Sequence, residues 1–420
     1  MKKHFLSMLV VVMVVVISGA SIFAAPKSVT IRYWYQSQNK ILDEYFVDAV
    51  KAFEKNYPNI KVEVTTLPQA QADQDLKLNA AVLSGTYPDV ISAMLSQIGT
   101  RGSQGEFYPL DRYINSWKDK TDIYESVYEL GKLKGKTLGL GYSPNPDVLV
   151  YRKDYFKEAG LDPEKPPTNW DELASYAKKL TIKDGNNNIT RAGLDIPALN
   201  SSAVIKMFGR QNNAIVINER KEKPMLDDPA LIQAVEFMLS LKDSSIPFNY
   251  VKKDTTPFIY GRSAMSFMQP SQAMTMIAND PSMKNKIGFA PVINGKKKVA
   301  WCGFRLFAIG SGSKYKKEAW EFIKFMMSQE QMTTRFKDLK IPVVRKSLEN
   351  DYIKDDPSLN KAILEYVKYG QGDNLVEWNT IATKYIHLAY EEAYSGKKTV
   401  AQAFKDGQNA LLNDLKNMKK

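Results

Sequence analysis

The side chains that most often carry catalysis or bind metals are nearly absent from this chain. Cys302 is the only cysteine, and His4 and His387 are the only histidines. A lone cysteine cannot form an intramolecular disulfide or a cysteine-based zinc cluster. Two histidines leave little room for a histidine metal site or a histidine-based catalytic triad. We therefore expect no metal, no other cofactor and no catalysis by histidine or cysteine, and binding is the first chemistry to look for.

The charge of the chain is the next feature that limits its function. The formal net charge of +12 comes mainly from lysines interleaved with acidic residues, as in 314–321. No arginine-rich stripe and no nucleic-acid motif accompanies these lysines. We expect a solvated basic surface and no nucleic-acid partner, with a polyanion-binding surface protein as an alternative.

Residues 1–24 have the layout of a secretory signal peptide. A positively charged start is followed by an apolar stretch over 5–17 and by small residues over 18–25. Cleavage after Ala24 or Ala25 would export the rest of the chain, whereas an uncleaved membrane anchor is the alternative. Ser21 stands near the place where a bacterial lipoprotein carries its lipidated cysteine. We therefore expect an exported protein, periplasmic or extracellular, without a lipid anchor.

The elements that would position a binding site alternate between strand and helix patterns. Residues 29–35 and 60–64 have strand patterns, with helical apolar spacing between them, and a helix over 76–82 precedes a strand that begins near Pro88. The later strand and helix patterns cover 139–142, 148–151, 286–292, 304–309, 318–327, 375–393 and 400–415. This alternation predicts mostly parallel sheets covered by helices. A length of 420 residues favours two lobes over one core.

Several ordered motifs make the chain similar to a known family. The motifs lie at 52–62, 83–90, 151–161, 167–173, 258–265 and 319–326. Among them are Leu-Ser-Gly-Thr-Tyr-Pro-Asp-Val at 83–90 and Tyr-Arg-Lys-Asp-Tyr-Phe-Lys-Glu-Ala-Gly-Leu at 151–161. With them, nearly the whole mature chain resembles the extracellular solute-binding proteins that feed carbohydrates to ATP-driven importers, the group that includes the maltose-binding protein.

The resemblance implies a periplasmic-binding-protein-like α/β fold of two lobes, each with a mostly parallel sheet flanked by helices, joined by crossing hinge segments. Lobe one would comprise 25–142 plus 289–340, and lobe two 143–288 plus 341–420. The Pro-rich break at Ser143–Pro146 and the Ile341-Pro342 dipeptide would then lie at crossings. The resemblance also implies a monomer that captures a mono- or oligosaccharide by hinge closure and delivers it to ABC permease subunits in the membrane.

A sugar site needs flat rings for the apolar faces of the sugar and planar polar groups for its hydroxyls. In α/β proteins ligands gather beyond the carboxyl ends of strands. The candidates at such positions, and at the predicted connector between the lobes, are Trp34, Gln36, Gln38, Ser96, Gln97 and Asn145. Ser96 and Gln97 depart from the acidic pattern of the family, which speaks against a maltose-like ligand.

Four further candidates come from the second half of the chain. Gln269 lies in a stretch where relatives commonly place an aromatic residue, and Ser271 is not aromatic. Trp301 and Arg305 bracket a region that lies next to the ligand in the family, and an arginine there can pair with a carboxylate, which raises the hypothesis of an acidic sugar. Trp378 opens the penultimate helix, where relatives use a tryptophan for stacking.

A secreted carbohydrate-active hydrolase is the remaining alternative. Such an enzyme needs only two carboxylates and no histidine, so composition does not exclude it. No local pair of acids stands out at a strand end, and the resemblance favours binding without catalysis.

Overall fold

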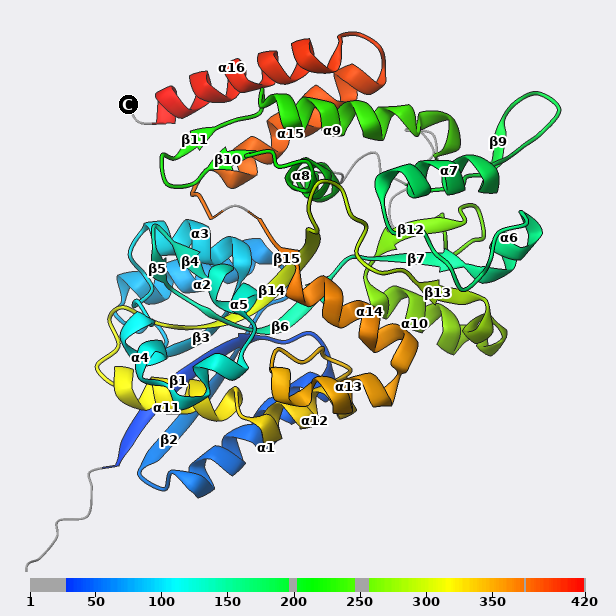
Figure 1. Cartoon of the computed structure of the whole chain (residues 1–420). Coiled ribbons are helices and arrows are strands. Elements are labelled where there is room, and N and C mark those ends of the chain that lie inside the picture. The colour runs from blue at the N-terminus through cyan, green and yellow to red at the C-terminus, as the bar shows by residue number, and fades with distance from the viewer. Residues whose placement is uncertain (1–27, 196–201, 246–256, 374, 419–420) are drawn as a thin grey trace, which may run out of the picture.

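The computed structural model describes residues 28–195, 202–245, 257–373 and 375–418, so the signal peptide predicted over 1–24 lies outside the described residues. The chain forms two α/β bodies, each built around its own sheet (Figure 1). We call the body around β1 lobe one and the body around β7 lobe two. None of the described helices is long and apolar enough to cross a membrane.

Lobe one is built on a six-stranded sheet. Its strands are β1 (Val29–Gln36), β2 (Ile60–Leu67), β3 (Val90–Met94), β6 (Leu140–Pro146), β14 (Ala300–Ile309) and β15 (Gly370–Gln371). β1 is parallel to β2 and β3, and β14 runs antiparallel to β3 and β6 and parallel to β15. The predicted strands at 29–35 and 60–64 and the strand near Pro88 are therefore confirmed.

Helices cover both faces of this sheet. They are α1 (Lys40–Asn56), α2 (Gln71–Leu83), α3 (Leu95–Ser103), α11 (Lys316–Met326) and α12 (Gln329–Leu339). α2 and α3 lie on one face, and α1, α11 and α12 on the other (Figure 1). α1 begins where the Asn39 side chain accepts a hydrogen bond from the Leu42 backbone N–H at 2.9 Å. Its apolar residues recur on one side and are buried, which is why the helical spacing in the sequence predicted it.

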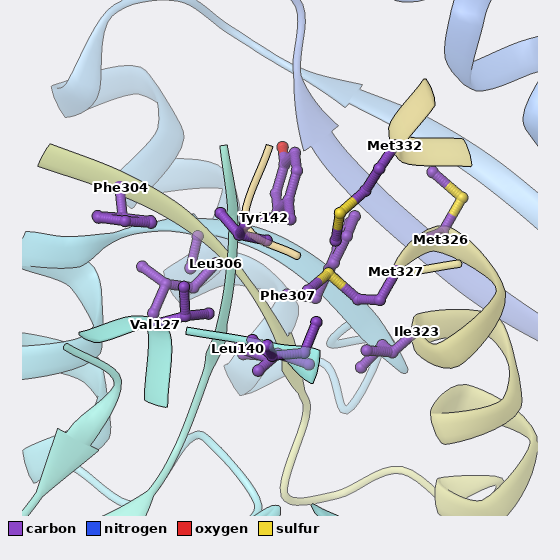
Figure 2. Close-up of a cluster of buried hydrophobic side chains, with 14 of the residues drawn as sticks. Val127, Leu140, Tyr142, Phe304, Leu306, Phe307, Ile323, Met326, Met327 and Met332 are labelled. Atoms are coloured by element: carbon purple, nitrogen blue, oxygen red, sulfur yellow. The ribbon is translucent and has the colours of Figure 1, made fainter. Parts of the chain in front are cut away.

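The core under β14 combines aromatic and methionine side chains from distant segments. Figure 2 shows Tyr142 of β6 and Phe307 of β14 close to Ile323 and Met326 of α11. The rings of Tyr142 and Phe307 stack with centroids 3.9 Å apart. The Tyr142 hydroxyl lies 2.6 Å from the Ser92 hydroxyl, so this buried polar group has a partner. This packing holds β14 firmly against its neighbours.

Lobe two contains a three-stranded sheet, β12-β7-β13. The strands are β7 (Val148–Arg152), β12 (Met265–Met268) and β13 (Ile287–Phe289). The predicted two-lobed α/β fold is confirmed, but the parallel pairing expected for this sheet is wrong. Both β12 and β13 run antiparallel to β7. Alternation in the sequence suggested parallel crossovers, whereas long segments return the chain to β7 in the opposite direction.

Helices surround the second sheet and form most of lobe two. They are α6 (Lys153–Glu158), α7 (Trp170–Leu180), α8 (Ser202–Gln211), α9 (Pro229–Ser240), α10 (Pro270–Asn279), α15 (Asn379–Tyr394) and α16 (Val400–Met418). The smaller elements include α4 (Asp111–Ser116), α5 (Glu125–Glu129), α13 (Glu349–Asp355), α14 (Pro357–Lys368) and the hairpins β4 (Lys132–Leu133) with β5 (Lys136–Thr137), β8 (Ile182–Lys183) with β9 (Ile189–Arg191), and β10 (Ile217–Asn218) with β11 (Lys223–Pro224).

In the part of the chain that the structure describes, three segments pass between the two lobes. β6 leads through Asp147 into β7, and β13 leads back to β14. The third passage lies at Leu375–Val376, because Leu375 packs in the core of lobe one and Val376 in the core of lobe two. The predicted domain boundaries stay a prediction, but apolar side chains between Val343 and Leu375 pack in the core of lobe one, although 341–420 was assigned to lobe two.

The Pro-rich stretch at Ser143–Pro146 has a different form from the expected connector. These residues continue β6 and pair with Arg305, Phe304, Gly303 and Cys302 of β14. β6 has β14 as its neighbour in the sheet and is therefore an edge strand. Prolines are tolerated there because one side of the strand needs no backbone N–H for pairing. The crossing itself begins one residue later, at Asp147.

Candidate ligand-binding cleft

A cleft of about 640 Å³ lies where the lobes meet. It is lined from lobe one by the start of α1 (Gln38, Asn39), the start of α3 (Met94–Ser96) and β14 (Trp301, Gly303–Arg305). β6 contributes Ser143–Pro146, and lobe two contributes Gln269–Ser271 at the start of α10. The remaining lining residues are Leu339–Pro342, Ile363 and Asp373. This size is ordinary for a small-molecule site.

Most of the residues predicted from the sequence line this cleft. They are Gln38, Ser96, Asn145, Gln269, Trp301 and Arg305. They come from five separate segments of the chain, and the fold brings them around one space. Whether each of them touches a ligand stays a prediction, which the position of the side chain supports.

Trp34 and Gln36 sit near the end of β1 but outside the lining of the cleft. Trp34 lies on the α2 side of the sheet, where the Lys77 ammonium is 5.2 Å from its ring centroid. Gln36 stands behind the cleft: its side-chain N–H₂ donates to the Gln69 carbonyl at 2.7 Å, and its side-chain oxygen accepts from Arg305 Nη2. Trp34 and Gln36 are two residues apart and therefore share one face of β1, whereas Gln38 lies beyond the end of the strand and lines the cleft.

Gln97 and Trp378 are buried away from the cleft. Gln97 is 2% exposed, and its side-chain oxygen accepts from the Met94 backbone N–H at 2.9 Å, which caps the start of α3. Its amide nitrogen faces the Gln74 side-chain oxygen at 3.4 Å. Trp378 is 9% exposed and belongs to the core of lobe two. Gln97 therefore stabilises the start of α3 and Trp378 stabilises a core, and their positions in the sequence alone did not reveal these roles.

β14 forms the floor of the cleft. Trp301, Gly303 and Arg305 alternate with the buried Cys302 and Phe304, and all three are half-buried on the cleft side. A Cβ atom built on Gly303 would meet only the Asn145 carbonyl oxygen, at 3.6 Å. The floor is therefore open between the tryptophan ring and the guanidinium, and a ligand ring has room there.

Amide side chains from the end of β1 hold Arg305 in place. Gln36 accepts a hydrogen bond from Arg305 Nη2. With its oxygen turned toward the guanidinium, Gln38 accepts from Nη2 at 2.5 Å and from Nε at 2.6 Å. Both partners are neutral, so Arg305 is oriented without being neutralised. Among the described residues, no carboxylate forms an ion pair with it.

Asp373 is a cleft residue that the sequence analysis did not select. Its carboxylate forms an ion pair with Lys206 of α8 at 2.8 Å, and Lys206 also donates to the Asn379 side chain at 3.1 Å. Burial lowers the pKa of Lys206, and the Asp373 charge opposes that shift. The lysine side chain is completely buried. The only signal in the sequence was Gly-Asp-Asn at 372–374 just before the Trp378 helix, and the partner is distant in sequence.

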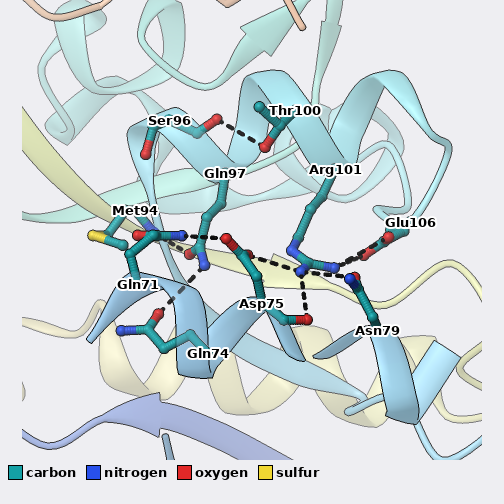
Figure 3. A network of polar contacts seen from close by, with 10 residues as sticks. All are labelled: Gln71, Gln74, Asp75, Asn79, Met94, Ser96, Gln97, Thr100, Arg101 and Glu106. Carbon is teal, nitrogen blue, oxygen red and sulfur yellow. Dashed lines mark hydrogen bonds and ion pairs between the residues drawn. The ribbon is translucent and has the colours of Figure 1, made fainter. Parts of the chain in front are cut away.

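The start of α3, which forms one edge of the cleft, is fixed by a polar network (Figure 3). Arg101 of α3 donates to Asp75 at 2.8 Å, to Asn79 at 3.1 Å and to both oxygens of Glu106. Burial alone would lower the pKa of Arg101, but its hydrogen bonds to Asp75 and Glu106 raise it above the usual value. The network joins α3 to α2, so Met94 to Ser96 are presented from a rigid support.

Asp147 lies at the first crossing between the lobes, and burial makes the ionised form of its carboxylate unfavourable. Burial raises its pKa to about 6. Its backbone N–H donates to the Trp301 carbonyl at 3.2 Å, which ties the crossing to the cleft floor. Among the residues the structure describes, no group of histidine, cysteine and acidic side chains is arranged to hold a metal ion.

A cleft between two α/β lobes, floored by an aromatic ring and an oriented guanidinium, defines a ligand-binding protein. Residues 48–361 match a family model whose description is "Bacterial extracellular solute-binding protein". The match covers well over half of the chain, and the chain belongs to this family.

Individual relatives and solved structures agree with that family. The multiple sugar-binding protein of Streptococcus mutans is 24% identical over 417 residues, covering 92% of this chain and 91% of the relative. The sugar-binding protein MalE of Xanthomonas citri has a similar structure, with a TM-score of 0.80 at 20% identity, covering 93% of this chain and 98% of the other. An ABC transporter solute-binding protein of Thermotoga lettingae, bound to α-D-tagatose, has a TM-score of 0.70 at 22% identity, covering 91% and 99%.

Proposed function

We propose that this chain is the exported sugar-binding subunit of an ABC importer, and that it captures a saccharide in the inter-lobe cleft without chemical change. The observation that carries the proposal is the floor of β14, where the half-buried ring of Trp301 lies beside the open space over Gly303. Aromatic rings bind the apolar face of a sugar, and surrounding amides and hydroxyls bind its hydroxyl groups. Gln38, Asn145 and Gln269 offer such amides in the lining of the cleft.

Membership of a solute-binding family supports export and delivery to a transporter. In this proposal the ligand bridges residues of both lobes, so it favours the closed arrangement by its higher affinity for that form. Permease subunits at the membrane would then bind the closed conformation of this protein, which we propose to be a monomer. The segments at Asp147 and Leu375–Val376 are the places where backbone angles would change.

A thermal-shift screen of the mature chain against neutral, amino and acidic mono- and oligosaccharides tests this proposal. A true ligand at about a hundred times its Kd adds roughly 2.7 kcal/mol to the free energy of unfolding, which is a clear rise in Tm. Trp301→Ala should remove the rise. Trp34→Ala is the matched control, because that tryptophan lies outside the cleft and should keep it.

The same samples distinguish binding from catalysis. Incubation of the bound oligosaccharide with the mature chain should release no reducing sugar. Release of reducing ends by the purified chain would make it a hydrolase instead. The proposal fails if no saccharide in the panel raises the Tm of the wild type.

A further inference from the structure

The charges around the cleft are unevenly balanced. The charged residues that line it, among those the structure describes, are Arg305, Lys340 and Asp373. Asp373 is paired with the buried Lys206 at 2.8 Å, and Lys340 is paired with Asp355 at 3.3 Å. Arg305 is different, because its partners are the neutral amides of Gln36 and Gln38. The cleft therefore contains one fixed positive charge with no fixed negative charge beside it.

The hydrogen bonds of Arg305 leave part of its donor set for a ligand. A guanidinium has five N–H donors in a planar fork. The two glutamine amides engage Nη2 and Nε, and in the described part of the chain neither N–H of Nη1 has a partner. The arginine lines the cleft and is only half-buried, so a ligand can reach it. Two amides thus fix the direction of the guanidinium and keep its charge available.

The spacing along β14 gives the ligand a minimum shape. A strand rises about 3.3 Å per residue, so Trp301 and Arg305 lie about 13 Å apart along the floor, with Gly303 midway. Among the described residues outside its immediate neighbours in the chain, only the Asn145 carbonyl oxygen lies within 4 Å of a Cβ built on Gly303. A sugar ring on Trp301 can reach Arg305 through a second ring or an extended substituent.

We propose that the ligand is an anionic saccharide, whose carboxylate or phosphate group binds Arg305 while a sugar ring packs on Trp301. The proposal rests on the sugar-binding function proposed above. Carboxylate and phosphate share the chemistry that a guanidinium recognises: a delocalised negative charge with paired acceptor oxygens. A neutral sugar would leave the charge of Arg305 without a counter-charge in a partly desolvated site.

Titration calorimetry on the mature chain with matched sugars tests this inference. The probes are disaccharide pairs long enough to span the floor: digalacturonate beside a neutral galactose disaccharide, a glucuronate-terminated disaccharide beside its neutral glucose form, and a glucose disaccharide 6-phosphate beside the same disaccharide without phosphate. We expect an anionic form to bind at least tenfold more tightly than its neutral match. Arg305→Gln should remove that preference, with an unchanged Tm of the free protein as evidence that it folds. Arg112→Gln, which removes the same charge from an exposed position outside the cleft lining, should keep it.

Each result has a defined meaning. Preference for a uronate or for a sugar phosphate, lost in Arg305→Gln, supports the inference and identifies the anionic group. Neutral sugars that bind the wild type as tightly as the anionic forms, with no effect of Arg305→Gln on the ratio, overturn the inference and leave the sugar-binding function standing. Absence of binding by every saccharide overturns both.

Discussion

Two arginines in lobe one hold their positive charge in different ways. Arg101 of the α2–α3 network is 4% exposed and has acidic partners in Asp75 and Glu106. Arg305 on the cleft floor is half-buried and is held by amides. A buried charge is stable only when it is paired and fully hydrogen-bonded. The first arginine therefore serves the fold, whereas the second keeps its charge for a ligand.

The difference shows how a binding protein can keep a charged group rigid without neutralising it. Amide oxygens accept hydrogen bonds and fix the direction of a guanidinium, but they carry no net charge. A carboxylate in the same place would compete with an anionic ligand. Replacing either arginine by glutamine separates the two roles.

The largest expected effect is on the stability of Arg101→Gln. Removing the arginine leaves the Glu106 and Asp75 carboxylates partly buried without their partner, which costs about 3–5 kcal/mol for a buried pair. Arg305→Gln should cost less than about 1 kcal/mol, because its partners are neutral. Urea unfolding of the free proteins measures both losses. Equal losses would show that Arg305 is also a structural residue.

The second largest effect is on the ligand affinity of a variant at the cleft floor, in a residue that binding needs and stability does not. Gly303→Leu should lower affinity for the ligand at least a hundredfold, about 2.7 kcal/mol, because the new side chain fills the open space beside Trp301. The free energy of unfolding should change by less than about 1 kcal/mol, since a Cβ there meets only one ordinary contact. Calorimetry and urea unfolding measure the two quantities.

Gly312→Leu is the matched control for that substitution. A Cβ on Gly312 meets nothing within 4 Å, and the residue lies outside the cleft lining. Affinity should therefore be unchanged. If Gly303→Leu binds as tightly as this control, the ligand does not occupy the floor of β14.

The smallest effect concerns Asp147, a charge for which burial is the only cause of its shifted pKa. Burial raises that pKa to about 6, so the ionised carboxylate destabilises the folded protein above that pH. The cost decreases as the pH falls through about 6 and disappears only below the ordinary value near ~4, where the carboxyl is protonated in both states. Asp147→Asn should raise the free energy of unfolding by about 2–3 kcal/mol at pH 7.5, and by almost nothing near pH ~3, below both pKa values.

Urea unfolding at the two pH values measures this difference. Asp73→Asn, which changes an exposed acid in α2, is the control and should alter stability little at either pH. An equal gain from Asp147→Asn at both pH values would show that the carboxylate is not the source of the penalty. It would instead indicate an effect of packing at the crossing.

Several elements of the fold could be predicted because their signal is local. The alternating pattern of β1, the helical spacing of α1 and the apolar run of α11 each depend on neighbours in sequence. The orientation of β12 and β13 beside β7 depends on chain paths over many residues, and it was predicted incorrectly. The packing of apolar residues such as Val343, Ile363 and Val367 with lobe one also depends on distant contacts.

The residues of the candidate site also fall into two groups: those that the sequence analysis selected correctly and those whose role depends on distant contacts. Trp301 and Arg305 were selected because they bracket a region that lies next to the ligand in the family the sequence resembles, and both line the cleft from β14. Trp378 and Gln97 have suitable chemistry, yet one is buried in the core of lobe two and the other caps α3. Asp373 was missed because its role depends on Lys206, which lies far away in sequence.

By itself, the amino-acid sequence indicated the class of the protein through its ordered motifs, and its single cysteine and two histidines left few routes to metal or histidine chemistry, because motifs and residue types are local properties. Only the tertiary structure decided which polar side chains face the cleft and which stabilise the fold through hydrogen bonds or packing. The reason is that a side chain's role depends on its partners, and those partners come from segments that meet only after folding. Arg305 differs from Arg101 in its partners: distant glutamines, rather than carboxylates, lie beside it.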